Sequence, residues 1–96
     1  MWVKQTDSLV KTNSNSVSVR FKCPQCNTSN TFTDVAIPEF SDNYEKATDT
    51  DVSEDDEREC SNSKCKSVFK ITVTNGPGGF LIQVTDIADS DIEYEL

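Results

Sequence analysis

The chain has 96 residues and a formal net charge of -8, and only 34% of its residues are hydrophobic. A domain of this length and apolar content has a marginal core, because short chains bury a small fraction of their surface. No run of about 18 apolar residues is present, so the sequence predicts no membrane-spanning helix. The four cysteines are the residues that could staple so small a core.

The amino-terminal residues bear on the cellular compartment. The stretch MWVKQTDSLV lacks the apolar core of about 7–15 residues that a secretory signal peptide has. We therefore expect a cytoplasmic protein in a reducing environment, where disulfides are disfavoured. In such an environment, close pairs of cysteines indicate metal binding or redox chemistry.

The acidic charge is unevenly distributed along the chain. Residues 39–59 carry ten acidic residues against Lys46 and Arg58, and residues 86–96 carry five acidic residues and no basic one. The rest of the chain holds seven basic and two acidic residues, so the surroundings of the cysteines are basic. Acidic runs with few apolar residues stay solvated. We therefore expect 39–59 to be a mobile insertion and 87–96 to be an acidic tail.

The first half of the chain predicts one β-hairpin. Residues 1–15 are polar and weakly patterned, and they could supply an edge strand. Residues 16–22, SVSVRFK, alternate apolar and polar side chains, which indicates a half-buried strand that leads into Cys23. After the turn residues NTSN, the β-branched stretch 31–37, TFTDVAI, is expected to form the returning strand.

The second half predicts another hairpin. The stretches SVFKITV (67–73) and FLIQVTD (80–86) both alternate apolar and polar side chains. The residues TNGPGG between them are typical of a hairpin turn, so we expect 68–74 to pair with 80–86. The sequence thus predicts a mostly β domain over 16–86, in which one cysteine pair joins the first hairpin and the other opens the second.

The cysteines occur as two close pairs, CPQC and CSNSKC. A zinc ion takes four ligands in a tetrahedron, and both pairs have spacings found in structural zinc sites. Pro24 suits the tight turn of the first pair, and Asn27 tolerates the left-handed backbone that often follows such a turn. The predicted ligands of one structural zinc ion are Cys23, Cys26, Cys60 and Cys65.

The long separation of the two pairs does not argue against one shared ion. Closing a flexible loop of about 33 residues costs roughly 3 kcal/mol of chain entropy. Structural zinc in small peptides contributes an apparent free energy of about 10–16 kcal/mol. The metal term is therefore several times larger than the entropic cost of closing the loop.

The order of these features resembles the zinc-ribbon (rubredoxin-like) superfamily: a strand, C-P-x-C, a returning strand, an insertion, a second cysteine pair and a hairpin. The resemblance covers residues 16–86 and implies that the four cysteines are the metal ligands. The sequence departs from the family pattern in two respects. Asn27 and Lys66 stand where the family usually has glycine, and the second pair has four intervening residues where the family usually has two. The family implies a scaffold and no particular activity.

The cysteine pattern leaves three other interpretations open. Two disulfides would form if the chain were secreted, and iron could occupy a rubredoxin-type site. A thioredoxin-like role for CPQC is disfavoured, because NTSNTFT after it is a poor helix former and that chemistry uses a helix N-terminus. A catalytic metal is also disfavoured, since four cysteines leave no open position, and the chain has no histidine to act as a general base. We assign no catalytic residues and no small-molecule substrate.

Three binding functions fit these features. The first is a protein-interaction module or adaptor, for which Trp2 is a candidate anchor unless it is buried against a hairpin. The second is a mimic of nucleic acid, in which the acidic segments occupy the basic groove of a nucleic-acid-processing protein. The third is a nucleic-acid-binding zinc ribbon of the transcription-factor type, although the net charge disfavours it. The basic residues available for the third function are Arg20, Lys22, Lys64, Lys66 and Lys70.

Overall fold

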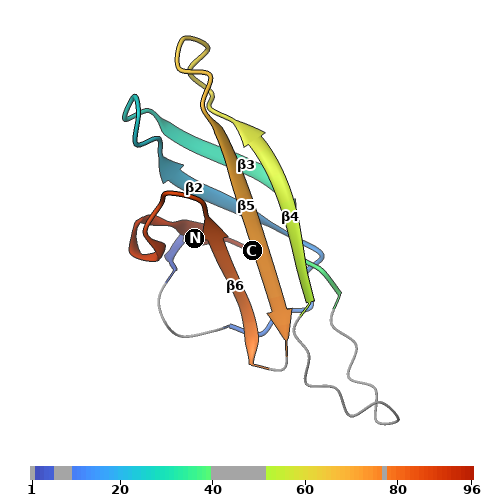
Figure 1. Ribbon diagram of the computed structural model, residues 1–96. Helices are drawn as coiled ribbons and strands as arrows, with labels where there is room; N and C mark the ends of the chain where they lie inside the picture. Colours follow the sequence, from blue (N-terminus) through green and yellow to red (C-terminus); the bar gives the residue numbers. More distant parts are fainter. Residues whose placement is uncertain (1, 6–9, 40–51, 77) are drawn as a thin grey trace, which may run out of the picture.

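The structure is a computed structural model that describes residues 2–5, 10–39, 52–76 and 78–96. Within these ranges the chain forms β-strands and one turn of 3-10 helix, and the expectation of a mostly β fold is confirmed (Figure 1). The strands are β1 (Val3–Lys4), β2 (Ser16–Lys22), β3 (Ser29–Ala36), β4 (Val52–Glu59), β5 (Val68–Gly76), β6 (Gly79–Val84) and β7 (Glu93–Glu95), and the 3-10 turn is η1 (Asp89–Asp91).

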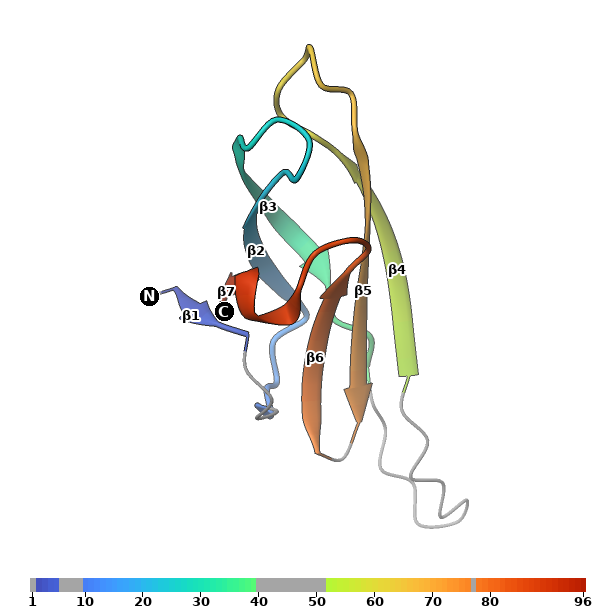
Figure 2. The same ribbon diagram turned by 60° about the vertical axis from the view of Figure 1, so that its left-hand side comes forward.

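The strands form two antiparallel sheets with the core between them. One sheet has the order β1-β7-β2-β3 and the other has the order β4-β5-β6 (Figure 2). The apolar faces predicted for β2, β5 and β6 are all buried, because each strand alternates between the core and the surface. The buried residues of these three strands are Val17, Val19, Phe21, Phe69, Ile71, Val73, Phe80, Ile82 and Val84.

Both predicted hairpins are present. β2 pairs with β3 from Ser16↔Ala36 to Lys22↔Ser29, and β5 pairs with β6 from Ile71↔Val84 to Gly76↔Gly79. The short strand β1 lies at an edge and pairs with β7, which confirms an edge strand for part of the amino-terminal segment. No helix in the described part of the chain is long and apolar enough to cross a membrane.

The expectation that 39–59 is a mobile insertion is wrong for residues 52–59, which form β4. All eight residues of β4 pair with β5, from Val52↔Asn75 to Glu59↔Val68. The sequence VSEDDERE lacks an apolar alternation, so the strand is determined by its neighbour and not by its own pattern. Cross-strand polar contacts support the pairing: Thr72 Oγ1 donates to Asp55 Oδ1 at 2.8 Å. The remainder of that predicted insertion, residues 40–51, lies outside the described residues.

The expectation that 87–96 is an acidic tail is also wrong. Ile92 and Tyr94 are 0% and 5% exposed and belong to the core, and β7 lies between β1 and β2. The sequence IEYE alternates apolar and acidic residues, which is the pattern of a half-buried strand. The local charge concealed this alternation. The folded unit therefore extends beyond the predicted limits of 16–86 on both sides.

Candidate metal centre

The two cysteine-bearing loops lie together at one end of the molecule (Figures 1 and 2). The four Sγ atoms all lie within 4.8 Å of one another. The Sγ atoms of Cys23 and Cys65 are 3.6 Å apart, as are those of Cys26 and Cys60. Four sulfurs at about 2.3 Å from a tetrahedral ion would be separated by about 3.8 Å, whereas a disulfide bond measures about 2.05 Å. The predicted ligand set is therefore assembled, and its spacing fits one metal ion.

The first loop, residues 23–28, is a tight turn that its own backbone closes. The amide of Cys23 donates to the Thr28 carbonyl at 2.9 Å, and the amide of Asn27 donates to the Cys23 carbonyl at 2.8 Å. Asn27 has a φ of 63°, which is the left-handed conformation expected for this position. This loop is called the first knuckle below.

The second loop, residues 60–67, has the same plan and is called the second knuckle. The amide of Cys60 donates to the Ser67 carbonyl at 2.7 Å, and Lys66 has a φ of 57°. Asn62 organises the wider turn. Its carbonyl accepts from the Cys65 amide at 3.0 Å, and its side-chain oxygen accepts from the Lys64 amide at 3.1 Å.

Each knuckle places a hydroxyl group beside its second cysteine. The Cys26 thiol donates to Thr28 Oγ1 at 3.2 Å, and Ser67 Oγ lies within hydrogen-bond distance of Cys65 Sγ, at 3.1 Å. A hydroxyl can donate to a thiolate, and the thiolate is the form of cysteine that binds metal. The Thr28 hydroxyl and then the Thr28 backbone lower the pKa of Cys26 from 9.0 to about 6.

The first cysteine of each pair is the buried one. Burial raises the pKa of both, but the net shifts have opposite signs. For Cys23, burial raises the pKa, but hydrogen bonds from the backbone of Cys26 and Gln25 outweigh it and the pKa is lowered. For Cys60, burial raises the pKa and the opposing hydrogen bonds only partly offset it. Of the two buried cysteines, Cys23 therefore favours the thiolate more strongly than Cys60 does.

Asn30 connects the two knuckles and was not identified from the sequence. It is fully buried. Its Nδ2 donates to the Thr28 carbonyl at 3.1 Å and lies 3.6 Å from Cys60 Sγ, while its Oδ1 accepts from the Ser61 amide at 2.7 Å. A buried amide with partners on both loops holds them in register. An asparagine four residues after CPQC gives no sequence signal for this role, because asparagine is equally common in turns.

An aromatic cluster packs in the same core as the four cysteines. The rings of Phe21 and Phe69 meet edge to face across the two sheets, with centroids 4.9 Å apart. Phe32 packs against both rings, at centroid distances of 5.6 Å and 6.3 Å. Such contacts add to the free energy of burying the rings. The cysteines therefore adjoin a part of the core in which side chains of the two sheets pack together.

Two of the basic residues considered for nucleic-acid binding contact acidic residues within the fold. Arg20 pairs with Glu93 at 3.0 Å, and its guanidinium lies 4.4 Å from the ring centroid of Trp2. Lys70 pairs with Asp55 at 3.4 Å. Trp2 itself is half-buried under Arg20, so its ring is only partly available as an anchor for a partner.

A cleft of about 500 Å³ lies beside the first knuckle. Its lining includes basic side chains from β1 and β2 and acidic side chains from 86–93. Charges of both signs face it, so the cleft shows no preference for a cationic or an anionic ligand. The charged lining residues are Lys4, Arg20, Lys22, Asp86, Asp91 and Glu93.

Comparison with known proteins identifies no relative. No family model matches the chain, and neither curated proteins nor solved structures show a match to it. The four-cysteine cluster is consistent with a zinc-binding domain, and its geometry is the main evidence on function.

Proposed function

We propose that the chain is a non-catalytic domain that holds one structural zinc ion through Cys23, Cys26, Cys60 and Cys65 and serves as a protein-interaction module. The observation that carries the metal assignment is the approach of all four Sγ atoms to within 4.8 Å. When bound, the ion would supply a crosslink between the two sheets in place of a larger core.

The chemistry of the ligand set supports a structural ion over a catalytic one. Four cysteine sulfurs would fill a tetrahedral coordination shell, so no position is left for water or substrate. The hydroxyls of Thr28 and Ser67 lie beside two of the sulfurs and would orient them. Reduced cysteines also require a reducing compartment, which is the basis for proposing a cytoplasmic location.

Membership of the zinc-ribbon superfamily is a further part of the proposal. Each knuckle joins two paired strands of one sheet, β2 to β3 or β4 to β5, and both knuckles have a left-handed residue after the second cysteine. These features support the resemblance drawn from the sequence. The wider second turn is compatible with it, because Asn62 supplies hydrogen bonds for the two additional residues.

Metal analysis of the native protein tests the scaffold. Protein purified from zinc-containing medium should show one bound zinc ion by native mass spectrometry and elemental analysis, and removing it with a chelator should abolish the cooperative melt. Iron at one equivalent would change the proposed metal but not the site. Retention of the cooperative melt without metal, or two disulfides in the purified protein, would refute the structural role of the ion.

Affinity capture tests the interaction role. Zinc-loaded protein should capture a partner that the chelated protein does not, and the partner should be recovered by a variant in which Asp42, Glu45, Asp49 and Asp51 are changed to their amides. This variant removes charge from residues 40–51 and leaves β4 intact. Capture that depends on these four acids alone would favour the acidic mimic, and direct salt-sensitive binding of DNA or RNA would favour the nucleic-acid-binding alternative.

A further inference from the structure

The two sheets have four edges in the described part of the chain, and three of them are blunted. β1 has only two residues. β3 is distorted where Asp34 takes a φ of 57° and the pairing with β2 shifts register. The start of β6 is covered by the chain at Val10, whose carbonyl accepts from the Phe80 amide at 2.9 Å. A Cβ atom at Gly79 would come within 2.7 Å of the Val10 backbone, so only glycine fits there.

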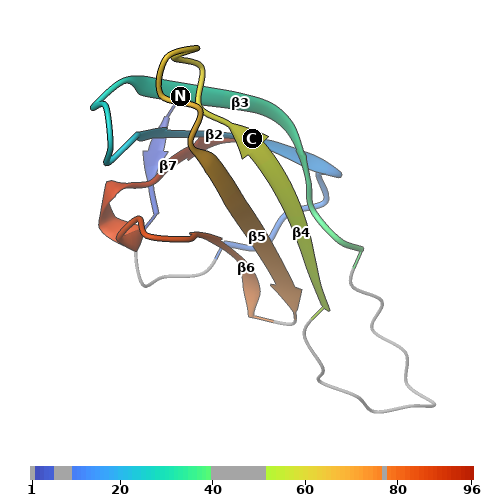
Figure 3. The ribbon, with the colours of Figure 1, turned by 45° about the horizontal axis from the view of Figure 1, so that its top comes forward.

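β4 forms the fourth edge, and it is long and regular. Its eight residues pair with β5 without a register shift. In an antiparallel strand, every second residue directs its N–H and C=O groups away from the partner strand. β4 lies at the edge of its sheet (Figure 3), and no other described strand pairs with it. A row of these groups therefore faces outward along it. A regular unpaired edge of this kind is a template for one more strand.

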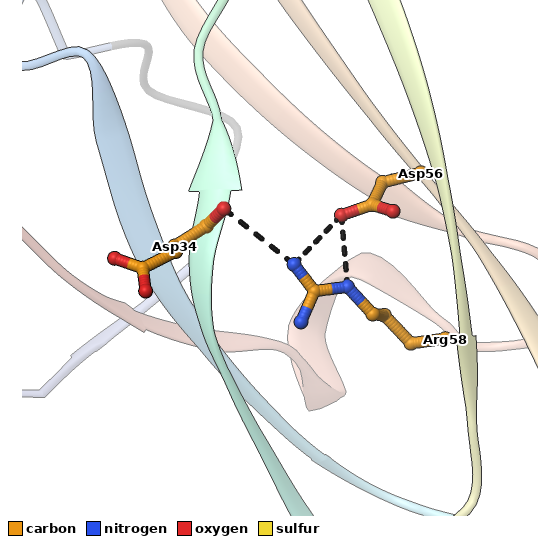
Figure 4. A network of polar contacts seen from close by, with 3 residues as sticks. All are labelled: Asp34, Asp56 and Arg58. Atoms are coloured by element: carbon orange, nitrogen blue, oxygen red, sulfur yellow. Dashed lines mark hydrogen bonds and ion pairs between the residues drawn. The ribbon is translucent and has the colours of Figure 1, made fainter.

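One end of this edge is occupied by a contact with the other sheet. Arg58 donates to the Asp56 carboxylate at 2.9 Å and reaches the backbone carbonyl of Asp34 on β3 at 3.5 Å (Figure 4). The half of β4 before Arg58 is more exposed, and Ser53, Glu54 and Asp55 are all on the surface. The open part of the edge therefore runs over about 52–57.

The charge of β4 indicates what kind of strand it could accept. Five acidic residues and one arginine give it a net charge of -4. Asp55 and Glu57 lie on one face of the strand, and Glu54 and Asp56 lie on the other. Like charges opposite each other destabilise a strand pair, so two copies of β4 repel, whereas a strand rich in lysine or arginine is attracted. The acids thus select against self-association and in favour of a basic partner.

We propose that the open edge of β4 binds an extended basic segment of a partner protein as an added β-strand. The proposal rests on the proposed interaction role and identifies the surface and the partner chemistry. Backbone hydrogen bonds to β4 would supply affinity, and alternating basic side chains beside Glu54 to Glu57 would supply specificity.

Three synthetic eight-residue peptides test the proposal with the zinc-loaded full chain. A capped Lys-Thr repeat can form a strand and carries four positive charges, a Lys-Pro repeat has the same charge but lacks half of the amide donors, and a Glu-Thr repeat can form a strand with the opposite charge. We expect the Lys-Thr peptide to bind at least about tenfold more tightly than either of the others. Its binding should protect the amides of β4 from hydrogen exchange.

A charge-reversed variant locates the binding to β4. Glu54→Lys with Glu57→Lys should weaken binding of the Lys-Thr peptide about tenfold or more. The matched control, Asp89→Lys with Asp91→Lys, changes the net charge equally in η1, which contacts β6, and should keep most of the affinity. Zinc content and the thermal melt check that both variants fold. If the β4 variant does not fold, the comparison of the three peptides on the unchanged chain decides.

Several outcomes would overturn strand addition. Equal binding of the Lys-Thr and Lys-Pro peptides would show attraction by charge alone, as expected for an acidic mimic. Equal weakening by the β4 and η1 variants would place binding elsewhere, and absence of binding would refute the proposal outright. The proposed interaction role fails separately: it stands if the β4 variant still captures a zinc-dependent partner, and it falls if zinc-loaded protein captures none.

Discussion

The two knuckles place their cysteines with the same backbone features, although their loops differ in length. In each, the amide of the first cysteine donates to the carbonyl of the residue two positions after the second cysteine, at 2.9 Å in the first knuckle and 2.7 Å in the second. That residue is Thr28 in one knuckle and Ser67 in the other, and each hydroxyl lies beside the second sulfur. A left-handed residue, Asn27 or Lys66, precedes each of them.

The difference lies between the cysteines. The second knuckle has two additional residues there, and Asn62 fixes them with its carbonyl and its side-chain oxygen. Its Nδ2 also lies 3.4 Å from Thr28 Oγ1 in the first knuckle. The closing hydrogen bond and the left-handed residue, which both knuckles share, therefore set the sulfur positions. The residues between the ligands can vary in number if a side chain satisfies their backbone.

Removing a ligand should have the largest effect and should be equal for the two knuckles. Cys23→Ser or Cys60→Ser would leave three sulfurs for the metal, and the fold would lose a large share of the roughly 10–16 kcal/mol that structural zinc contributes. We expect either variant to be unfolded at 25 °C by circular dichroism and to carry no stoichiometric metal. A soluble Cys23→Ser protein with an unchanged spectrum would contradict the structural role of the ion.

Removing the bridge between the knuckles should have the next largest effect. Asn30→Ala loses the contacts with Thr28 and Ser61 and leaves the Ser61 amide without its side-chain partner. Each of these two hydrogen bonds contributes about 0.5–1.5 kcal/mol, so chemical denaturation of the zinc-loaded protein should show a loss of about 1–3 kcal/mol. Asn13→Ala, at an exposed position, is the control and should change the stability little. Equal stability of the two variants would show that Asn30 does not couple the knuckles.

The metal ligands and the hairpins were predictable from the sequence because each has a local signature. The spacing of the cysteines and the alternation in SVSVRFK and FLIQVTD are read within a few residues. β4 was not predictable, because its acidic residues form a strand only against β5. Asn30 was also missed, since its function depends on a contact with Ser61, 31 residues away. Both β4 and Asn30 depend on contacts between segments that are far apart in the chain, which no local pattern reveals.

The hydroxyl of Thr28 should determine how acid releases the metal. It is the largest of several contacts, the Thr28 backbone among them, that together lower the pKa of Cys26 from 9.0 to about 6. Because this pKa is depressed, the thiolate persists as pH falls until about 6, and protons compete with zinc for this sulfur only below that value. Thr28→Val should raise the pKa, weaken zinc binding at pH 7 and move acid release to higher pH. A chromophoric zinc indicator monitors the release during titration.

Two control variants sharpen this test of the knuckles. Ser67→Ala removes the corresponding hydroxyl beside Cys65, so its titration shows whether the second knuckle depends on its hydroxyl in the same way. Thr31→Val changes an exposed threonine on β3 and should leave the release midpoint unchanged. A midpoint that Thr28→Val does not move would show that the hydroxyl has no part in stabilising the thiolate.

The smallest expected effect concerns the two left-handed residues. Lysine in this conformation is strained by roughly 1–2 kcal/mol, whereas asparagine tolerates it better. Lys66→Gly should therefore stabilise the zinc-loaded protein by about 0.5–1 kcal/mol after the greater entropy of glycine in the unfolded chain is deducted. Asn27→Gly should change the stability by only a few tenths of a kcal/mol. Lys64→Gly, which lies in the second knuckle like Lys66, should not stabilise the protein. Chemical denaturation with saturating zinc measures the stability of all three variants.

Equal effects of Lys66→Gly and Asn27→Gly would show that backbone strain does not distinguish the two knuckles. Destabilisation by Lys66→Gly would show that the lysine side chain contributes more stability than its left-handed backbone costs.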